Sequence, residues 1–570
     1  MAMFDVANNR LSYGELLQPE LGYELEFAVG LTYSLDLEAL LGIPVSFGLL
    51  DEVDSSLMKS PFYMLEAIRK SGDRLAIFCN AGGISLPKNI QSVYSLLEKS
   101  VFEIRLPNRQ NFHPKLWFAK YINGEGESYI KVLVLSRNMT FDSSIDLCVE
   151  LKGDIKRRPY LKNKPLADML SFVSKYAEKS KRQRIINLSE DIMKVRLFDV
   201  NHPFEDYEFL PIGIDDYDKD NTKLFEGKYD LFAVSPFLSD DIVKGLTNCN
   251  HNKVLITRKA SVTKTVLDRF DSVYITKDIL SDNEYGVKQD IHAKMYFTRS
   301  QEGNYLYVGS ANASYNAFHN NVEFLLKLKY KPRCVGFKMI FEDFIPEEHC
   351  PFELITTVPD DLIVDNEKII IEKAVKEAIY AIKGAKITCD GDTYKVVIKT
   401  KELTSGVPIK VAPMQRQNMN RDLQQETLFE GMLLKELSDF FILSIYDKKL
   451  VIKIKTKGMP EDRDDAIYKN IIDSKSKFLS YVSLILADNF ATGVIEESEY
   501  LRLMMGNDND ENKYPTISAL YEKMLKAVHQ HPGRLKEIAN IIEKLDDGIV
   551  SDEFLKMYQK FERAARRLTK

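Results

Sequence analysis

Two stretches of the chain repeat the same ordered series of short motifs. Each series contains His-x-Lys, then Ser-x-Asn, then a strand-like segment with Glu. The first series is HPKLWFAKY at 113–121, VLVLSRNMT at 132–140 and DLCVEL at 146–151; the second is HAKMYFTRS at 292–300, LYVGSANAS at 306–314 and NNVEFLL at 320–326. The two histidines are separated by about the length of one domain. This self-similarity predicts a duplicated unit, so the chain should fold as two related halves.

The same local structure is expected in both copies. A strand through His-x-Lys places the His and Lys side chains on one face, two residues apart. The β-rich runs 131–135 and 305–309 end at Ser-x-Asn, where a strand opens into a turn. Pro114 cannot donate to a ladder, so the first His-x-Lys strand is expected to be irregular or at a sheet edge there.

Strand-like and helix-like segments alternate before each copy, at 74–100, 229–246 and 253–270. This alternation predicts a mixed α/β sheet in each half. The expected fold class is therefore α/β, with two halves forming one pseudo-twofold catalytic unit and a C-terminal α+β, largely helical domain. The expected units are a first half at 1–155, a basic linker and helix at 156–200, a second half at 201–355 and the C-terminal domain at 360–570.

The C-terminal region carries no chemical motif that we recognise. An amphipathic helix is expected at 369–386, strands at 393–400 and 440–456, and helices at 464–489 and 515–568. The polar segment 410–428 is expected to be a loop.

Composition excludes several classes of protein. The formal net charge of -6 argues against a uniformly basic protein that coats nucleic acid, although not against a local basic patch. No signal peptide and no run of about 18 apolar residues occurs, so a cytoplasmic protein without a membrane span is expected. The six cysteines form no CxxC pair and are expected to be reduced thiols without zinc. No P-loop is present, so the chain is not expected to hydrolyse ATP by that route.

A basic run at 152–184 allows two interpretations. It is either a solvated linker and helix face or a track for a phosphate backbone that leads to the site. The candidate nucleic-acid-binding residues in this run are Lys156, Arg157, Arg158, Lys181, Arg182 and Arg184.

The duplicated residues suit the cleavage of a phosphodiester. A neutral His can attack phosphorus to give a phosphohistidine, while a second, protonated His protonates the leaving oxygen and later activates water. The duplication supplies these two histidines, His113 and His292, without deciding which one attacks. The donors for the charged phosphoryl oxygens are Lys115, Lys294, Asn138 and Asn312. Two lysines do what a metal does elsewhere, so neither metal nor cofactor is expected.

Four further residues are expected to support these groups. Ser136 and Ser310 would hold the turn or donate to a phosphate oxygen. Glu150 and Glu323 lie in otherwise apolar strands, where a carboxylate needs a partner. The natural partner is a His ring N–H, which would fix the tautomer of that His.

These motifs resemble the HxK…GSxN signature of the phospholipase D superfamily (HKD-type). HAK…GSAN fits well, whereas HPK…LSRN has Leu135 in place of the glycine, and Ala119 and Thr298 replace the usual Asp. Because they lack this Asp, the motifs are more similar to those of the nuclease and DNA-repair branches than to those of the lipases. The segment 12–41 and the helical ending also resemble bacterial nucleases found beside helicases in phage-defence loci, which implies a helicase or ATPase partner.

The leading hypothesis is a metal-independent phosphodiesterase that works through a covalent phosphohistidine. The resemblance implies a bacterial DNA nuclease of the phage-defence or restriction type. Two alternatives stay open. The chain could be a phospholipase or a hydrolase of small phosphodiesters, or it could be an interaction protein that only binds phosphate or nucleic acid. DNA or RNA as substrate, endo- or exonuclease action and the oligomeric state stay undecided.

Overall fold

The computed structural model describes most of the 570 residues. The described ranges are 13–49, 60–141, 144–218, 222–249, 251–277, 290–359, 366–486, 517–530, 532–546 and 548–568.

The first half is built on one six-stranded sheet. Its order is β5 (Val101–Ile104), β3 (Leu75–Asn80), β1 (Tyr23–Leu31), β6 (Leu116–Asn123), β7 (Ser128–Leu135) and β9 (Cys148–Asp154). The first three strands are parallel, and β6, β7 and β9 continue the sheet in antiparallel pairs. Helix α3 (Pro61–Ser71) and the 3-10 helix η3 (Ser92–Lys99) form the crossovers that parallel strands require.

The second half repeats this sheet and adds a strand at each end. Its order is β10 (Phe204–Ile212), β17 (Glu323–Tyr330), β16 (Gly303–Gly309), β15 (Met295–Ser300), β11 (Lys228–Val234), β12 (Lys253–Thr257), β13 (Ser272–Thr276) and β18 (Phe352–Ile355). Strands β11, β12 and β13 are parallel and are connected by α6 (Asp240–Leu246) and α7 (Lys264–Arg269). The strand order β13-β12-β11-β15-β16-β17 of the second half matches the order β5-β3-β1-β6-β7-β9 of the first half, and the corresponding strands run in the same directions. The predicted α/β fold class with two related halves is confirmed.

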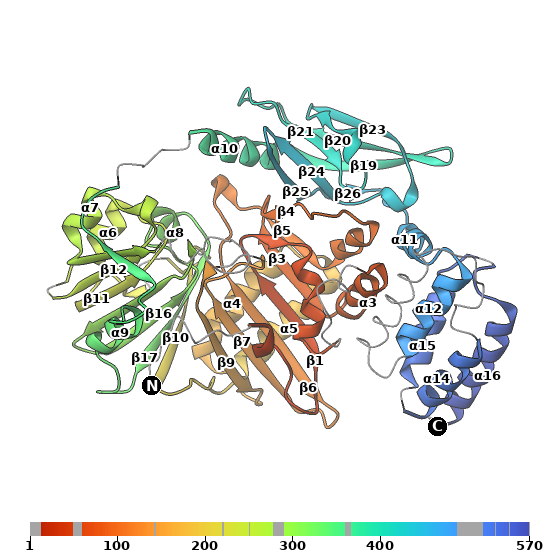
Figure 1. The fold of residues 1–570 in the computed structure, drawn as a ribbon, viewed down its shortest axis with the longest axis horizontal. Helices are drawn as coiled ribbons and strands as arrows, with labels where there is room; N and C mark the ends of the chain where they lie inside the picture. The colour runs from red at the N-terminus through yellow and green to blue at the C-terminus, as the bar shows by residue number, and fades with distance from the viewer. Residues whose placement is uncertain are drawn as a thin grey trace.

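The two sheets share one hydrophobic core. Apolar side chains of both sheets, including Val29, Phe118, Phe232 and Phe297, form a single buried cluster. Helices α4 (Lys164–Ser174), α5 (Lys179–Met193) and α9 (Phe337–Phe344) contribute to the same cluster. The outer face of each sheet has a core of its own. The halves lie side by side in Figure 1, and the shared core holds them in one orientation.

The His-x-Lys segments are not part of the strands, contrary to the expectation. Strands β6 and β15 begin at Leu116 and Met295, directly after Lys115 and Lys294. Pro114 therefore interrupts no ladder, and β6 lies in the interior of its sheet instead of at an edge.

The C-terminal region contains two sheets and a group of helices. After α10 (Asn366–Ala381), strands β19 (Ile382–Asp390) and β20 (Thr393–Thr400) form a sheet with β23 (Glu426–Met432) and β26 (Thr456–Lys457). The second sheet contains β21 (Lys410–Pro413), β22 (Arg421–Asp422), β24 (Phe440–Ile445) and β25 (Lys448–Lys453). The expected loop at 410–428 thus contains β21, β22 and the start of β23, and the helix expected at 369–386 ends at Ala381.

This region is joined to the first half by both backbone and core. Strand β25 pairs with β4 (Ile84–Ser85), which pairs with β2 (Leu35–Asp36). The C-terminal helices pack beside α3, as Figure 1 shows, and belong to the outer core of the first half. They are α11 (Arg463–Ile471), α12 (Lys475–Leu486), α14 (Ile517–Gln530), α15 (Gly533–Ile542) and α16 (Asp552–Leu568).

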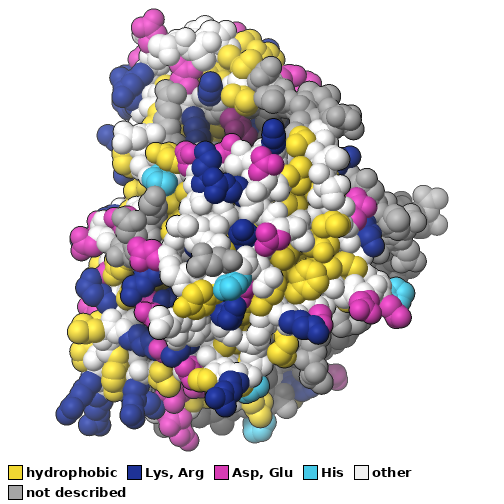
Figure 2. Space-filling view, turned by 90° about the vertical axis from the view of Figure 1, so that its left-hand side faces the viewer, with side chains coloured by type: hydrophobic (Ala, Val, Ile, Leu, Met, Phe, Trp, Pro, Cys, Tyr) yellow, Lys and Arg dark blue, Asp and Glu magenta, His cyan; other side chains and the backbone are white. Residues whose placement is uncertain are grey.

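The surface carries both signs of charge. Figure 2 views the side formed by the second half, where Lys and Arg alternate with Asp and Glu and hydrophobic patches lie between them. No helix in the described part of the chain is long and apolar enough to cross a membrane.

A buried ion pair connects α11 to the first half, and we expect it to stabilise the docking of the C-terminal region. Arg463 is 4% exposed, and its Nη2 lies 3.1 Å from Glu98 Oε2. Replacing Arg463 with Met leaves the Glu98 carboxylate buried without this partner, which should cost about 3 kcal/mol of unfolding free energy.

Thermal denaturation monitored by circular dichroism measures this loss. The control is Lys399→Met, which breaks an exposed ion pair with Glu426 and should cost less than about 1 kcal/mol. Equal melting temperatures for the two variants would show that the buried pair does not hold the region in place.

Candidate active site

Backbone hydrogen bonds that cross from each half to the other create the candidate site. The N–H of His113 donates to the carbonyl of Val322 at 2.9 Å, and the N–H of His292 donates to the carbonyl of Ile145 at 3.1 Å. Strand β14 (Asp290–Ile291) also pairs with β8 (Ser144–Ile145). Each His-x-Lys segment thus leaves its own sheet and lies against the other half. The two motifs meet with pseudo-twofold symmetry at the ends of β7 and β16.

Glu323 of the second half orients His113 of the first. Its Oε2 lies 2.8 Å from His113 Nδ1 and also accepts the Ser310 hydroxyl, while Asn321 donates to Oε1 at 3.1 Å. The carboxylate is fully buried, so these donors replace the water that a charged group requires. When His113 is neutral and carries its proton on Nδ1, its Nε2 has a free lone pair. This lone pair faces Lys115.

Asp146 of the first half takes the corresponding position beside His292. Asp146 Oδ1 lies 3.5 Å from His292 Nδ1 and accepts the Ser136 hydroxyl at 2.9 Å. The carbonyl of Ser136 lies 3.1 Å from the same Nδ1. A carbonyl only accepts, so this contact requires a proton on Nδ1 and leaves Nε2 facing the site. Asp146 was not among the residues singled out from the sequence.

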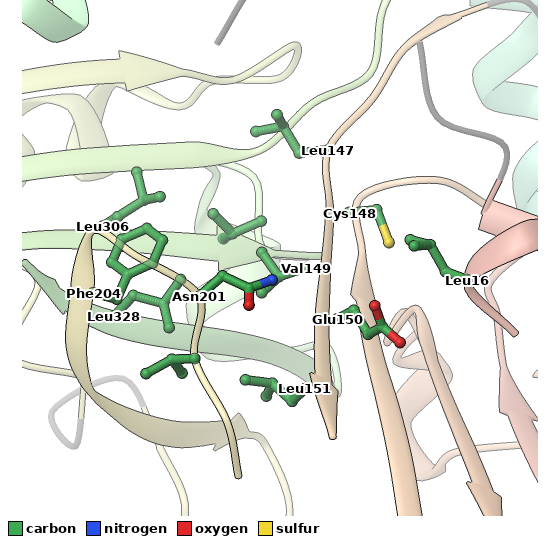
Figure 3. Close-up of a pocket in the computed structure, with 12 residues that line it drawn as sticks. Leu16, Leu147, Cys148, Val149, Glu150, Leu151, Asn201, Phe204, Leu306 and Leu328 are labelled. Carbon is green, nitrogen blue, oxygen red and sulfur yellow. The ribbon is translucent and has the colours of Figure 1, made fainter. Parts of the chain in front are cut away.

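Glu150 does not have the role that its spacing predicted. It lies four residues beyond Asp146, about 13 Å further along the strand direction, and its Oε1 pairs with Lys131 at 3.1 Å. Figure 3 shows Glu150 with Cys148 and Leu16 on one side of β9, at an apolar cavity of about 240 Å³. None of the candidate catalytic residues lines that cavity. The sequence-based pairing of Glu150 with a histidine is therefore wrong.

The two motif lysines are buried and close to each other. Lys115 is 1% exposed and Lys294 is fully buried. Lys115 Nζ contacts His113 Nε2 at 3.1 Å and the carbonyl of His113 at 3.0 Å, and Lys294 Nζ donates to the carbonyl of His292. Among the described residues, no carboxylate forms a direct ion pair with either ammonium group.

Burial and mutual repulsion make these lysines weak bases. Burial lowers the pKa of Lys115 to about 7, although Glu323 and Asp146 favour its charge. Burial, followed by repulsion from Lys115, lowers the pKa of Lys294 well below its usual value. A pair of buried ammonium groups without direct counter-ions provides a site that an anion would complete.

On balance, the surroundings lower the pKa of both histidines. Burial lowers the pKa of His113 to about 4, with Glu323 opposing this shift and Lys115 adding to it. Burial also lowers the pKa of His292, while its hydrogen bond to Asp146 favours the charged ring. Burial alone would raise the pKa of Asp146, but its contact with His292 and other donors lowers that pKa to about 2.

The Ser-x-Asn segments occupy equivalent turns. Ser136 Oγ accepts the N–H of Leu147 at 2.8 Å, and Ser310 Oγ accepts the N–H of Phe324 at 3.0 Å. The two serines therefore hold the turns against the strands that follow. Asn138 Oδ1 accepts the N–H of Ser34 at 3.5 Å, whereas the buried Oδ1 of Asn312 has no protein partner.

Two residues that sequence reasoning missed complete the site. Tyr33 follows β1, and its ring centroid lies 4.9 Å from that of His113 and 5.9 Å from Lys115 Nζ. Arg258 follows β12, donates from Nε to the carbonyl of Ile291 at 3.3 Å, and further disfavours the charge of Lys294. Both follow parallel strands at their carboxyl ends, a position where α/β sheets commonly place functional groups. That rule was the signal available in the sequence.

The basic run does not lead to the site. The site lies where β7 ends and β9 begins, whereas Lys156 follows the far end of β9, roughly 30 Å away along the strand. Lys181 and Arg184 donate to the carbonyls of Gly72 and Asp73 before β3, at the same far end. Arg182 binds three backbone carbonyls at 174–177. Arg157 and Arg158 are exposed directly after Lys156. The positions of these six residues therefore favour the solvated-face interpretation over a track that leads to the site.

The duplicated halves and their crossed His-x-Lys segments agree with the arrangement that the phospholipase D-like motifs imply. Yeast tyrosyl-DNA phosphodiesterase is similar over 58% of this chain and 87% of its own, at 12% identity and a TM-score of 0.36. Phosphatidylserine synthase from Haemophilus influenzae is similar over 63% and 96%, at 10% identity and a TM-score of 0.33. Nuc from Salmonella typhimurium is similar over 27% of this chain and 99% of its own, at 11% identity and a TM-score of 0.19.

No family model and no curated protein matches the sequence. At these identities the structural likenesses concern the fold alone, and they assign no role to any residue. The chemistry of the site must therefore be inferred from its own geometry.

Replacing Asp146 with Asn should lower the pKa of His292 further. The Asp146 carboxylate favours the charged ring, and the neutral amide removes that support while burial continues to oppose the charge. NMR titration of the protein with ¹³C-labelled histidine rings measures the change. Glu150→Gln is the matched control and should leave the titration of His292 as it is. If Glu150→Gln shifts this titration and Asp146→Asn does not, the assignment of Asp146 is wrong.

Proposed function

We propose that this protein is a phosphodiesterase that cleaves nucleic acid, with DNA as the leading substrate, at the His113/His292 site. The observation that carries the proposal is the pair of buried lysines, Lys115 and Lys294, which have no direct counter-ion in the described structure. A phosphodiester bound there would supply the missing negative charge. The Nδ2 amides of Asn312 and Asn138 would donate to the same group.

The geometry favours a two-step reaction in which His113 attacks. His113 is neutral over a wide pH range, and Glu323 holds its Nδ1 so that Nε2 can form a bond to phosphorus. The bond from phosphorus to the leaving oxygen breaks. His292 enters this step as the imidazolium, with a proton on each ring nitrogen and Asp146 beside it, and gives its Nε2 proton to that oxygen. In the second step His292 removes a proton from water, and the oxygen of that water displaces His113. Lys115 and Lys294 stabilise the charge on the phosphoryl oxygens in both steps.

Nucleic acid is favoured over lipid by what surrounds the site. Arg137 and Arg258 lie in loops directly beside the motifs, which suits a strand that carries further phosphates. The similarity to yeast tyrosyl-DNA phosphodiesterase and to Nuc is in accord with this choice. The apolar cavity at Glu150 is separate from the catalytic residues, so it offers no entrance for a lipid chain.

We further propose that this nuclease is cytoplasmic, acts in phage defence and works with a helicase or ATPase partner. This proposal rests on the resemblance of residues 12–41 and of the helical ending to defence-associated nucleases. Affinity purification of the tagged protein from its native cells, followed by mass spectrometry, tests the partner. Recovery of the chain without any ATPase would count against it.

The direct test is cleavage of labelled single- and double-stranded DNA and RNA in the presence of EDTA. DNA cleavage under these conditions would support a metal-independent nuclease, and cleavage of RNA alone would change the substrate. Release of a headgroup from phosphatidylglycerol vesicles without any cleavage of nucleic acid would instead support the phospholipase alternative.

His113→Ala and His292→Ala should each reduce turnover on the order of 10³-fold, because one site needs both groups. The control is His251→Ala, which changes an exposed histidine outside the site. Reactions with ³²P-labelled substrate that are quenched in alkaline SDS, where a phosphohistidine survives, should show a covalent adduct on the unmodified protein and on His292→Ala. Near-normal activity in either variant would contradict the shared site.

Turnover at low substrate concentration should fall as the pH rises through about 7. Lys115 is charged below its pKa of about 7 and neutral above it, and only the charged form attracts the phosphodiester. A bound anion should raise this pKa, so the decline in kcat should occur at higher pH than the decline in kcat/KM. A kcat/KM that is constant between pH 6 and 9 would exclude this role for Lys115.

A further inference from the structure

Three exposed aromatic side chains border the candidate site. Among the side chains described in residues 14–359, Phe141, Phe237 and Tyr315 are the aromatic residues with an exposed side chain, at 70%, 48% and 47%. Every other Phe, Tyr and Trp described there is buried or partly buried. All three follow the ends of strands at the candidate site. Phe141 and Phe237 lie in the loops after β7 and β11, and Tyr315 begins α8 (Tyr315–His319), which follows β16. Exposure of large rings costs free energy in water, so their gathering at one edge calls for a ligand.

On the His292 side, hydrogen bonds attach two of these rings to the catalytic turn. The Ser235 hydroxyl donates to the carbonyl of Phe237 at 2.9 Å and accepts the N–H of Ala313, the residue after Asn312. The N–H of Tyr315 donates to Ser239 Oγ at 2.7 Å. The loop that carries Phe237 and the start of the helix at Tyr315 are therefore fixed to each other and to the Ser-x-Asn motif.

Each of these two rings also has a stacked partner. The Arg258 guanidinium lies 4.6 Å from the ring centroid of Phe237, and its Nε donates to the carbonyl next to His292. The ring of His319 lies parallel to Tyr315, with 4.2 Å between centroids. These partners hold the rings in one orientation, which lowers the entropy lost when a ligand stacks on them.

On the His113 side, Phe141 occupies the position that Tyr315 has in the second half. It is five residues after Ser136, as Tyr315 is five residues after Ser310. The N–H of Met139 donates to Thr32 Oγ1, as the N–H of Ala313 donates to Ser235. Arg137 Nη2 donates to the carbonyl of Thr140 and holds the turn directly before Phe141. One arginine and at least one exposed ring thus flank each side of the site.

We propose that Phe141, Phe237 and Tyr315 stack with unpaired bases on both sides of the scissile phosphate, so that the substrate is a single-stranded segment. This inference rests on the proposed function and specifies its substrate class. Rings combined with arginine suit single strands because every base offers a π-face and every linkage a phosphate. In a duplex the base faces are already stacked and are not available to the rings.

A difference between the two halves also predicts the direction in which a nucleic-acid strand binds across the site. Phe237 and Arg258 have no counterpart in the first half, where Ser34 and Asn80 take the equivalent positions after β1 and β3. Asn80 instead accepts the N–H of Phe112 at 2.9 Å. The stronger stacking surface therefore lies beside His292, on the side of the leaving group if His113 attacks.

Fluorescence of 2-aminopurine in a 12-nucleotide DNA strand tests the proposal. Binding is measured with His113→Asn protein, so that the result does not depend on turnover. Phe141→Ala, Phe237→Ala and Tyr315→Ala in this background should each weaken binding roughly ten-fold. Phe237→Leu, which keeps apolar area but lacks an aromatic face, should behave like Phe237→Ala, and Phe237→Trp should restore binding. The control is Tyr446→Ala, which removes a ring of 52% exposure between β24 and β25.

Unchanged affinity in all three alanine variants would overturn the proposal, as would binding of a duplex hairpin as tightly as the single strand. Restoration by Leu as well as by Trp would also overturn it, because apolar contact would then suffice. Turnover of bis(p-nitrophenyl) phosphate by the unmodified protein reports separately on the catalytic centre. Aromatic-dependent binding without turnover would leave the stacking proposal standing and refute the proposed function, whereas turnover with unaltered binding would do the reverse.

Discussion

The exchange of carboxylates between the two halves is the interaction on which the site depends. Glu323 of the second half holds His113 of the first, and Asp146 of the first half lies beside His292 of the second. Neither half contains a complete site by itself. The backbone bonds from His113 to Val322 and from His292 to Ile145 fix this exchange, and the shared core between the sheets keeps the halves at the required distance. A hydrophobic core common to both sheets therefore has a catalytic consequence.

The buried lysines show how the protein accepts a cost in stability in return for an anion site. Each ammonium group is removed from water and repels the other, and the backbone carbonyls beside the histidines only partly compensate. Apolar residues of similar size would remove this cost. The presence of the two lysines in the middle of the molecule is therefore better explained by the binding of a ligand than by a contribution to folding. The lowered pKa of both histidines has the same origin, because burial and nearby positive charge both oppose protonation of the ring.

The duplication could be predicted from the sequence because it needs only order and spacing, and it led directly to the α/β halves. The second carboxylate was missed because Glu150 matches the spacing of Glu323 from Ser310 almost perfectly, whereas the connection in the first copy is shorter. A better guide was the residue that follows. The N–H of Leu147 and that of Phe324 both bind the motif serine, so the carboxylate directly precedes an apolar residue in each copy. The position of the basic run could not be found from composition, which carries no information on which end of a sheet a segment occupies.

The departures between the copies follow from local packing. A side chain at Gly309 would place Cβ 2.2 Å from the carbonyl oxygen of Phe324, so the second motif requires glycine there. Leu135, at the same position of the first motif, packs into the outer core of its half. The two turns therefore differ in their backbone environment although their serines make the same bonds. This asymmetry continues outward to Phe237 and Arg258, which only the second half possesses. A symmetric site would bind a strand equally well in both directions. Because the reaction distinguishes the attacked side of phosphorus from the leaving side, a difference between the halves is required to fix the direction, and the loops after β11 and β12 provide it.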